Sequence, residues 1–598
     1  MGSIRSKDGV HLQGDPIMLK GKIHSSRWTG WMVVLALLAV LAVLYLTRED
    51  ITSPPHLVNP QPATREIGIN QAGYAPSAVK IAYTTTAVGE FSLVDLQANH
   101  AVFRGVPTIS QKERNSGKPV YQMDFSSFQK PGVYQIQLSN GRGSAPFAIS
   151  DHVYQSIYQT AMRSYELQRC GIALADTVSH VHHEACHLAP AQVIGGQGGE
   201  RDVTGGWHDA GDYGKYTANA GMTTAQLLLA YELAPMTLKN TSLSLPQADE
   251  GERVAHAGEP DALAVIRVEL DWMRKMQRED GAVHHSVKTA EFPGMILPEE
   301  DRQPQYLYPV STPDTAIFAA AMARASRVYH SYDEPYAQML LDASKKAWAF
   351  LEGSSELLVP ESVQAYRIKS DKQSRVWAAA ELYFATGDLR YRSYVEKNLG
   401  ELELRPKKLT PSYWQHTSAM TIITLAMHQR TDWELTQQMR NLLIRHADQV
   451  VSRINQTAYG TVLQARDYDW ASTKTSLGYG VHLAVAYQME PKPAYLAAMS
   501  RQLDWVLGAN PLAQSFVTGI GMFSPVHPHH RYSAASGILV PGLLVGGPNA
   551  NANDNVAPQK QGAKSYVDDV RSFATNEYAI DYNAPLVVVA GFLHERRN

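Results

Sequence analysis

The stretch G-G-W-H-D-A-G-D-Y-G-K-Y at residues 205–216 is the most informative part of this 598-residue chain. It places two carboxylates, Asp209 and Asp212, three positions apart on a glycine-rich turn. Such a turn can point both side chains the same way, and Gly211 lets backbone or ligand approach closely. Two neighbouring carboxylates can hold one water molecule, with one of them acting as a base. An Asx-turn or a cation site is the alternative interpretation.

A second acidic segment, residues 566–585, lies near the end of the chain. In it Glu577 follows Asn576, which we expect to cap a helix, and precedes the apolar run of residues 586–589. A glutamate that enters an apolar wall is desolvated, so its pKa rises and it can act as a general acid. The alternative is a glutamate favoured in a first helical turn by the macrodipole. An acid for the leaving oxygen and a base for water are what glycoside hydrolysis requires.

Composition limits the classes of protein that need consideration. The chain is 44% hydrophobic and 19% charged, as expected of a globular protein with a large core. Its formal net charge is −3 and no basic block occurs beyond the N-terminus, which argues against nucleic acid as a partner. With only two cysteines, no disulfide framework can hold the fold together.

The N-terminal region predicts a membrane anchor. Residues 28–46 form an apolar stretch, long enough as a helix to cross the roughly 30 Å hydrocarbon core. Basic residues precede it, so the positive-inside rule keeps residues 1–27 in the cytoplasm and exports the rest. We therefore expect a single-pass protein of the inner membrane with its main domains on the periplasmic side. A cleaved signal peptide is the alternative.

The remaining chain divides into a spacer and two domains. Residues 47–64 are a proline-containing linker. Alternating strand patterns at residues 79–83, 91–95 and 133–138 predict an immunoglobulin-like β-sandwich over 65–150. From 151 to 598 the pattern becomes helical, and the absence of a strict repeat disfavours a solenoid. Helices are expected at 153–168, 217–234, 261–278, 313–331, 335–352, 373–386, 417–428, 432–452, 477–488, 492–507 and 583–594.

Two further clusters carry chemistry. Residues 527–532, H-P-H-H-R-Y, offer imidazole and guanidinium groups that suit sugar hydroxyls, although a metal-binding tract or a solvated loop would look alike. Upstream of Asp209, two thiols and two imidazoles make a Cys₂His₂ set for a structural zinc ion. A disulfide between the two cysteines, or a chance grouping, is the alternative. The four residues are Cys170, Cys186, His187 and His208.

Several of these segments together resemble a known family. I-G-I-N-Q-A-G-Y-A-P at 67–76, the stretch at 205–216, Y-P-V-S-T-P at 308–313, S-F-V-T-G at 515–519 and the segment at 566–584 occur in family order. The chain from about residue 65 to its end is similar to glycoside hydrolase family 9, in the subgroup with an N-terminal immunoglobulin-like domain.

The resemblance implies a mainly α fold, an (α/α)₆ barrel behind the β-sandwich, and inverting hydrolysis of β-1,4-glucans. It assigns Asp212 as the catalytic base, Asp209 as the residue that helps hold the water, and Glu577 as the acid. It also places His529, Arg531 and Tyr582 around a bound sugar. It favours zinc at the cysteine and histidine set, and members often bind calcium, for which we assign no ligands.

Three segments depart from the family pattern, at residues 284–288, 470–473 and 522–524. They affect the substrate rather than the carboxylates, and we assign His285, Trp414 and Trp470 as further substrate contacts. We expect an endo-β-1,4-glucanase-like enzyme for cellulose-like glucans, linked through its anchor to an exopolysaccharide synthesis complex. Alternatives are an exo-acting β-glucosidase or β-glucosaminidase, or a non-catalytic glycan-binding subunit.

Overall fold

The computed structural model describes residues 61–113, 116–195, 198–246, 258–360, 365–428 and 432–596. Within these ranges no helix has the length and apolar character needed to cross a membrane. The anchor expected at 28–46 and the cytoplasmic segment before it lie outside the described residues, as does most of the linker.

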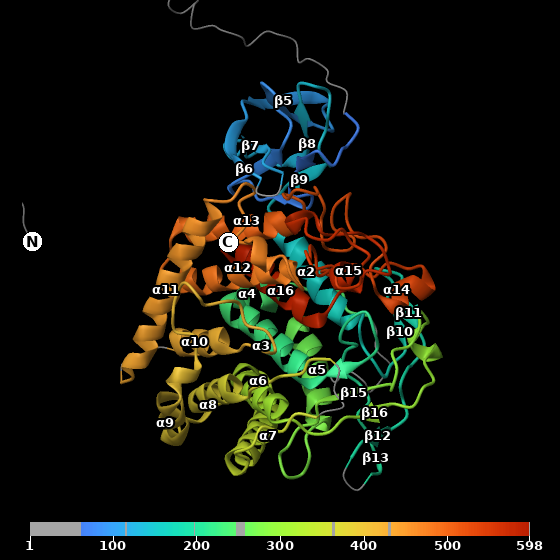
Figure 1. The fold of residues 1–598 in the computed structure, drawn as a ribbon, viewed down its shortest axis with the longest axis vertical. Coiled ribbons are helices and arrows are strands. Elements are labelled where there is room, and N and C mark those ends of the chain that lie inside the picture. Colours follow the sequence, from blue (N-terminus) through green and yellow to red (C-terminus); the bar gives the residue numbers. More distant parts are fainter. Residues whose placement is uncertain are drawn as a thin grey trace, which may run out of the picture. The chain divides into compact units, whose positions relative to one another are not determined.

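The N-terminal domain is a β-sandwich of two sheets, drawn in blue in Figure 1. Alternate residues of its strands point inward, and Phe91, Leu93, Tyr134 and Ile136 form part of a core of their own. One sheet has the order β1-β3-β7-β6 and the other the order β2-β9-β8-β4-β5. The strands are β1 (Ile67–Gly68), β2 (Gly73–Tyr74), β3 (Ile81–Thr84), β4 (Phe91–Asp95), β5 (His100–Gly105), β6 (Thr108–Lys112), β7 (Pro119–Asp124), β8 (Gly132–Leu138) and β9 (Phe147–Ile149). The predicted β-rich domain is confirmed.

The second domain is built from two concentric sets of helices. Among the described residues, six inner helices each contact the next, and the last contacts the first, so the ring closes. The inner helices are α3 (Thr217–Leu233), α6 (Thr312–Tyr329), α8 (Lys372–Thr386), α10 (Ser418–Met427), α12 (Ser472–Met489) and α16 (Ile580–Glu595). Against them pack the outer helices α5 (Asp261–Lys275), α7 (Glu334–Gly353), α9 (Leu389–Lys397), α11 (Glu434–Ile454), α13 (Pro493–Val506) and α2 (Val153–Glu166), in the same order around the ring. The predicted mainly helical fold is confirmed.

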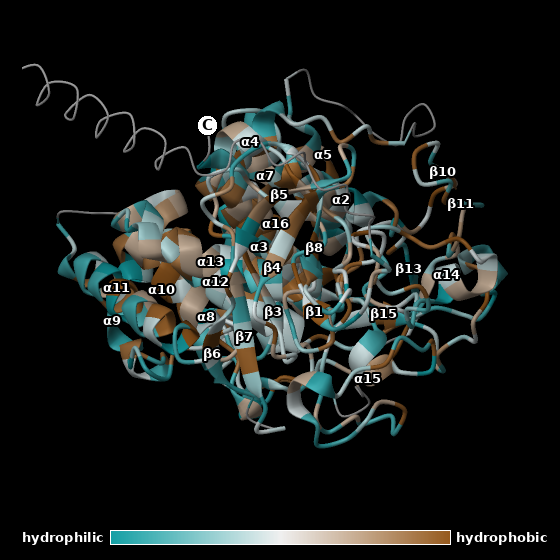
Figure 2. Cartoon of the chain, turned by 90° about the horizontal axis from the view of Figure 1, so that it is seen from above, coloured by the Kyte–Doolittle hydropathy of each residue, from teal (hydrophilic) through white to brown (hydrophobic). Residues whose placement is uncertain are grey.

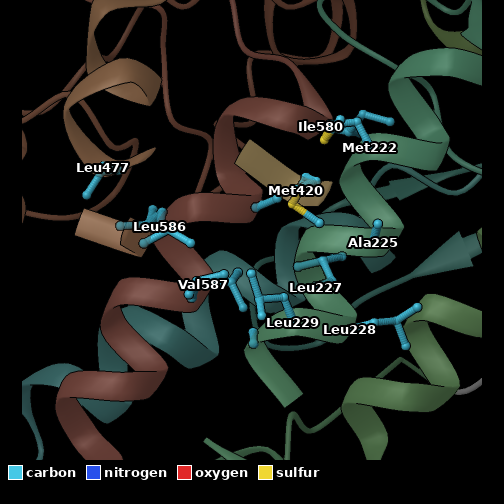
Figure 3. Close-up of a cluster of buried hydrophobic side chains, with 14 of the residues drawn as sticks. Met222, Ala225, Leu227, Leu228, Leu229, Met420, Leu477, Ile580, Leu586 and Val587 are labelled. Carbon is cyan, nitrogen blue, oxygen red and sulfur yellow. The ribbon is translucent and has the colours of Figure 1, made fainter. Parts of the chain in front are cut away.

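The inner and outer helices differ in the pattern of their hydrophobic residues. The inner helices are buried nearly all round, and α16 is largely in hydrophobic colours in Figure 2. Outer helices such as α9 are amphipathic and largely hydrophilic in colour. Figure 3 shows the contact between α3 and α16, where Leu227 and Leu229 lie beside Leu586 and Val587. This packing holds the inner ring rigidly and leaves its loop end to carry the chemistry.

Small sheets and short helices, which the sequence patterns did not predict, shape that loop end. A five-stranded sheet has the order β13 (Glu200–Arg201), β12 (Ala191–Val193), β16 (Tyr306–Leu307), β15 (Ser286–Lys288) and β14 (Lys215–Tyr216). Strands β10 (Leu174–Ala175) and β11 (His182–His183) pair beside it. The short helices α4 (Pro235–Asn240), α14 (Arg531–Ser536) and α15 (Phe573–Asn576) complete the set, with outer helix α9 also unpredicted.

Candidate active site

The turn that carries Asp209 and Asp212 is held by its own backbone and by the start of α16. The Asp209 N–H donates to the Gly214 carbonyl oxygen at 3.0 Å, and the Ile580 N–H donates to the Asp209 carbonyl oxygen at 2.8 Å. The Gly214 N–H donates to Oδ1 of Asp212 at 3.1 Å. The turn then runs into β14 and α3, so both carboxylates sit at the loop end of the inner ring.

Glu577 lies between α15 and α16 in extended backbone. The expectation that Asn576 caps a helix at this glutamate is wrong, because α16 begins at Ile580 and Asn576 ends α15. The Asn576 amide instead donates to the His527 carbonyl oxygen at 2.7 Å and to Oδ1 of Asp568 at 3.0 Å. Asn576 therefore fixes the glutamate segment to the loop that carries His529.

The two acidic segments meet at Gly211. Its N–H donates to Oε1 of Glu577 at 3.3 Å, and its carbonyl oxygen accepts from the Arg531 backbone N–H and from Nη1 of Arg531. A Cβ atom on Gly211 would lie 2.1 Å from the His529 carbonyl oxygen, so only glycine fits between the segments. The structure thus brings Asp209, Asp212 and Glu577 to one place, although their segments are far apart in the sequence.

Burial dominates the electrostatics of the three carboxyl groups. It raises the pKa of Glu577 to about 8, and the charge of Asp212 acts in the same direction while Arg531 opposes it. Burial also raises the pKa of Asp212, again against the charge of Arg531. The pKa of Asp209 is raised well above its ordinary value by burial, against hydrogen bonds from Tyr366 and Asn219. A protonated Glu577 near neutral pH can donate a proton to a leaving group.

A cavity of about 1070 Å³ contains the carboxyl groups and all the assigned substrate contacts except His285. Trp470 is 44% exposed, and its Nε1 donates to the Tyr582 hydroxyl at 2.7 Å. His285 is buried, where its Nδ1 lies 2.9 Å from Oδ2 of Asp314, so the structure does not bring it into the cavity. The assigned residues that line the cavity are Asp209, Asp212, Glu577, His529, Arg531, Tyr582, Trp414 and Trp470.

The structure adds residues that no sequence motif indicated. The Tyr366 hydroxyl donates to Oδ2 of Asp209 at 2.6 Å, and Nδ2 of Asn219 donates to Oδ1 at 2.7 Å. Lys474 lines the same cavity and pairs with Oδ2 of the buried Asp581 at 2.6 Å. Asn219 could have been noticed as a polar residue near the start of the helix that follows the Asp209–Asp212 turn. Tyr366 stands in a loop without a recognisable pattern.

The cysteine and histidine set also comes together. Its four ligand atoms all lie within 4.8 Å of one another, and this is the one group of three or more such side chains at metal-binding spacing in the described ranges. Both cysteines are free thiols, so the alternative of a disulfide does not occur in this structure. His187 presents Nδ1 to the cysteines and Nε2 to Oδ2 of Asp301, an arrangement typical of a zinc-bound histidine with an outer carboxylate. The donor set therefore fits zinc.

Comparisons with known proteins agree with this geometry. Residues 154–590 match the model of glycosyl hydrolase family 9, and residues 62–142 match the cellulase N-terminal ig-like domain. A cellodextrinase of Butyrivibrio fibrisolvens is 32% identical over 548 residues, which cover 88% of this chain and 98% of the relative. Endoglucanase D of Acetivibrio thermocellus is 32% identical over 544 residues, covering 88% of this chain and 83% of the relative.

A solved structure of a metagenome-derived family 9 endoglucanase shares the fold. It superposes with a TM-score of 0.83 at 37% identity and covers 88% of this chain and 99% of its own. The family match extends over most of the chain and contains every carboxylate of the cavity. The chain belongs to glycosyl hydrolase family 9 and is a glycoside hydrolase.

Proposed function

We propose that this enzyme hydrolyses β-1,4-glycosidic bonds of cellulose-like glucans or their oligomers with inversion at the anomeric carbon. The observation that supports the proposal is the meeting of the buried Glu577, whose pKa burial raises to about 8, with the Asp209–Asp212 turn in one large cavity. Relatives that cover most of the chain include a cellodextrinase and endoglucanases, which supports a β-1,4-glucan as the substrate.

In the proposed reaction Glu577 donates its proton to the glycosidic oxygen as the bond to the anomeric carbon breaks. Asp212 accepts a proton from a water molecule that attacks the anomeric carbon from the opposite face, and the new C–O bond inverts the configuration. Burial of Glu577 keeps the acid protonated near neutral pH, because the charged form is poorly solvated there.

Asp209 suits a positioning role better than a proton-accepting role. Both of its oxygens accept hydrogen bonds, one from Asn219 and one from Tyr366. Asp212 accepts one backbone hydrogen bond at Oδ1. Hydrogen bonds to both oxygens hold the Asp209 carboxylate in a fixed orientation, so we assign Asp209 to orient the water that Asp212 deprotonates.

Arg531 and His529 line the cavity with Glu577; Arg531 supplies donors for sugar hydroxyls, and His529, whose Nδ1 donates to the Val570 carbonyl oxygen, supplies an acceptor at Nε2. Trp470 and Trp414 offer aromatic faces for pyranose rings. Product analysis tests the proposal. Proton NMR of a soluble cello-oligomer digest should show the α-anomer released first, and release of the β-anomer would refute inversion. Chain-length distributions in the same digest separate endo action from the exo-acting alternative, and chitosan oligomers test the glucosaminidase alternative.

A zinc ion bound by Cys170, Cys186, His187 and His208 would brace the catalytic turn. His208 precedes Asp209 directly, and its N–H donates to the Gln168 carbonyl oxygen at 2.7 Å. A closed four-ligand site supplies folding energy rather than reactivity. Calcium, the second expected ion, stays a prediction without assigned ligands.

The N-terminal segment supports a proposal about location. Residues 28–46 and the basic residues before them favour a single-pass anchor in the inner membrane with the catalytic domain in the periplasm. An anchored glucanase is placed to trim a glucan during its synthesis or export. Membrane fractionation of the full chain and of a variant lacking residues 1–50 tests the anchor. A non-catalytic glycan-binding subunit is disfavoured, since all three carboxylates are present and lie together.

A further inference from the structure

The catalytic cavity extends deep into the ring of inner helices. Lys474 and His482 both line it and are eight residues apart on α12, which corresponds to roughly 12 Å along the helix axis. The deep arm lies between α3, α10, α12 and α16, and its walls include apolar side chains of Met420, Ile423 and Val481. These apolar walls offer a sugar ring few of the polar partners it needs, so the deep arm is poorly suited to substrate.

One face of α3 is polar along this direction. Asn219, Thr223 and Gln226 follow each other at positions i, i+4 and i+7, so their side chains share one stripe of the helix. The side-chain oxygens of all three are buried and have no hydrogen-bond partner among the described residues. Buried oxygens without partners are rare in native proteins, and ordered water is a frequent explanation. Asn219 and Thr223 are fully buried and do not line the cavity, so only Gln226 is placed to meet water in the arm.

The polar stripe begins beside the catalytic turn and ends at the floor of the arm, and of its three residues only Gln226 lines the cavity. At its upper end Nδ2 of Asn219 donates to Asp209, and at its lower end Gln226 lines the cavity. Gln226 is 7% exposed, and its Nε2 makes only a long hydrogen bond, 3.4 Å, to the Ser412 carbonyl oxygen. The floor can therefore accept a small donor molecule at Gln226.

His482 gives the floor a second acceptor. Nδ1 of His446 lies 2.7 Å from the Pro406 carbonyl oxygen and must carry a hydrogen there. In a neutral ring Nε2 of His446 is then an acceptor, and Nδ1 of His482, 3.0 Å away, must donate to it. This leaves Nε2 of His482 as an acceptor on a residue that lines the cavity.

We propose that the deep arm holds ordered water and supplies the hydrolytic water to the Asp209–Asp212 pair while a glucan chain covers the cleft. The inference rests on the inverting reaction proposed above. Each turnover consumes one water molecule, which must attack from the face opposite the leaving group. A bound polysaccharide excludes bulk solvent from above, so a source below the sugar ring allows the water to be replaced without release of the chain.

A crystallographic experiment on the wild-type enzyme tests the occupant directly. At high resolution, water molecules should lie within hydrogen-bond distance of Gln226 and of Nε2 of His482, with further water toward Asp209. Crystals pressurised with xenon should show no xenon in the arm. A dry arm, or one that takes up xenon, would overturn the proposal, because apolar cavities without water bind such atoms.

Variants of α3 test the role in turnover. Gln226→Leu removes polar atoms that line the arm at nearly constant volume, and Thr224→Val is a control on the same helix, since the Thr224 hydroxyl donates to the Ala220 carbonyl oxygen of its own helix. On a long soluble glucan kcat should fall roughly three- to tenfold with little change in KM, because positioning of the water is impaired. On a short aryl cellobioside, which leaves the cleft open to solvent, the loss should be smaller.

The opposite result has a clear signature. If no water is present at Gln226, Gln226→Leu removes a desolvation cost, so it should raise the melting temperature and leave kcat unchanged. That result overturns the proposal, as does a loss of kcat that is equal on long and short substrates. Wild-type turnover and the anomer released are measured in the same series, so a failure of the proposed reaction is distinguished from a failure of the water supply.

Discussion

Replacement of Gly211 by alanine should disable the enzyme through a single methyl group. The added Cβ would lie 2.1 Å from the His529 carbonyl oxygen and 3.0 Å from Oε1 of Glu577, whereas ordinary contacts begin at 3.4 Å. The Asp209–Asp212 turn and the His529 segment must then separate by about 1.3 Å, because both partners are backbone in a packed region. The separation also strains the hydrogen bond from Gly211 to Glu577.

A shift of this size moves the base away from the acid, and a displacement of about 1 Å can cost about 100-fold in rate. Overpacking should also lower the free energy of unfolding by about 1–3 kcal/mol. The assay is kcat on a soluble β-glucan, with thermal unfolding to show that the variant is folded. Gly353→Ala, at the end of α7 with nothing near its Cβ, is the control and should behave as wild type. A Gly211→Ala enzyme with wild-type kcat would refute the requirement for close approach of the two segments.

Other predictions address the acid, the base, the metal and the N-terminus. Activity should fall as the pH rises through about 8, because Glu577 loses the proton it must donate, and a pH–rate profile flat to pH 9.5 would contradict this assignment. Glu577→Gln should lose turnover of cello-oligomers but recover part of it on aryl glycosides. Asp212→Ala should stay inactive on both substrates unless azide is added. If Asp209→Ala loses more activity than Asp212→Ala, the roles assigned to the two aspartates are reversed. Purified enzyme should contain about one zinc ion per chain by elemental analysis, and Cys170→Ser should lower both the metal content and the melting temperature. A variant without residues 1–50 should remain folded and active, as judged by circular dichroism and glucan hydrolysis.

Much of this architecture could be predicted because periodicity reports burial. The inner helices are buried on nearly every face and the outer helices are apolar on one face, so both rings produced helical patterns at nearly correct positions. The short strands β12 to β16 were not predicted, because a strand of two or three residues is too short to show an alternating pattern. Outer helix α9 was not predicted, because only Tyr391 and Val395 of its sequence L-R-Y-R-S-Y-V-E-K are buried.

The catalytic carboxylates could be predicted because long motifs surround them, but their environment could not. Nothing in the local sequence indicates that Tyr366 reaches Asp209, since that contact depends on how residues 157 positions apart fold together. His285 shows the reverse error. We assigned it to the substrate because it lies in the segment 284–288, which differs from the family pattern. Strand β15, which follows it, pairs with β14 and β16 and is buried throughout, so the histidine side chain contacts Asp314 instead of the cavity.

Helix α3 shows where sequence and structure must be combined. Its apolar residues alone would suffice to pack it against α16, and Figure 3 shows Leu227 and Leu229 in that role. Asn219, Thr223 and Gln226 weaken this packing, because each buries a polar atom that the described structure leaves without a partner. Asn219, which holds Asp209, and Gln226, which lines the cavity, are better explained by the reaction than by the fold. The same reasoning applies to His482 on α12, which faces the other side of the same arm. The interior of the inner ring is therefore part of the active site as well as its support.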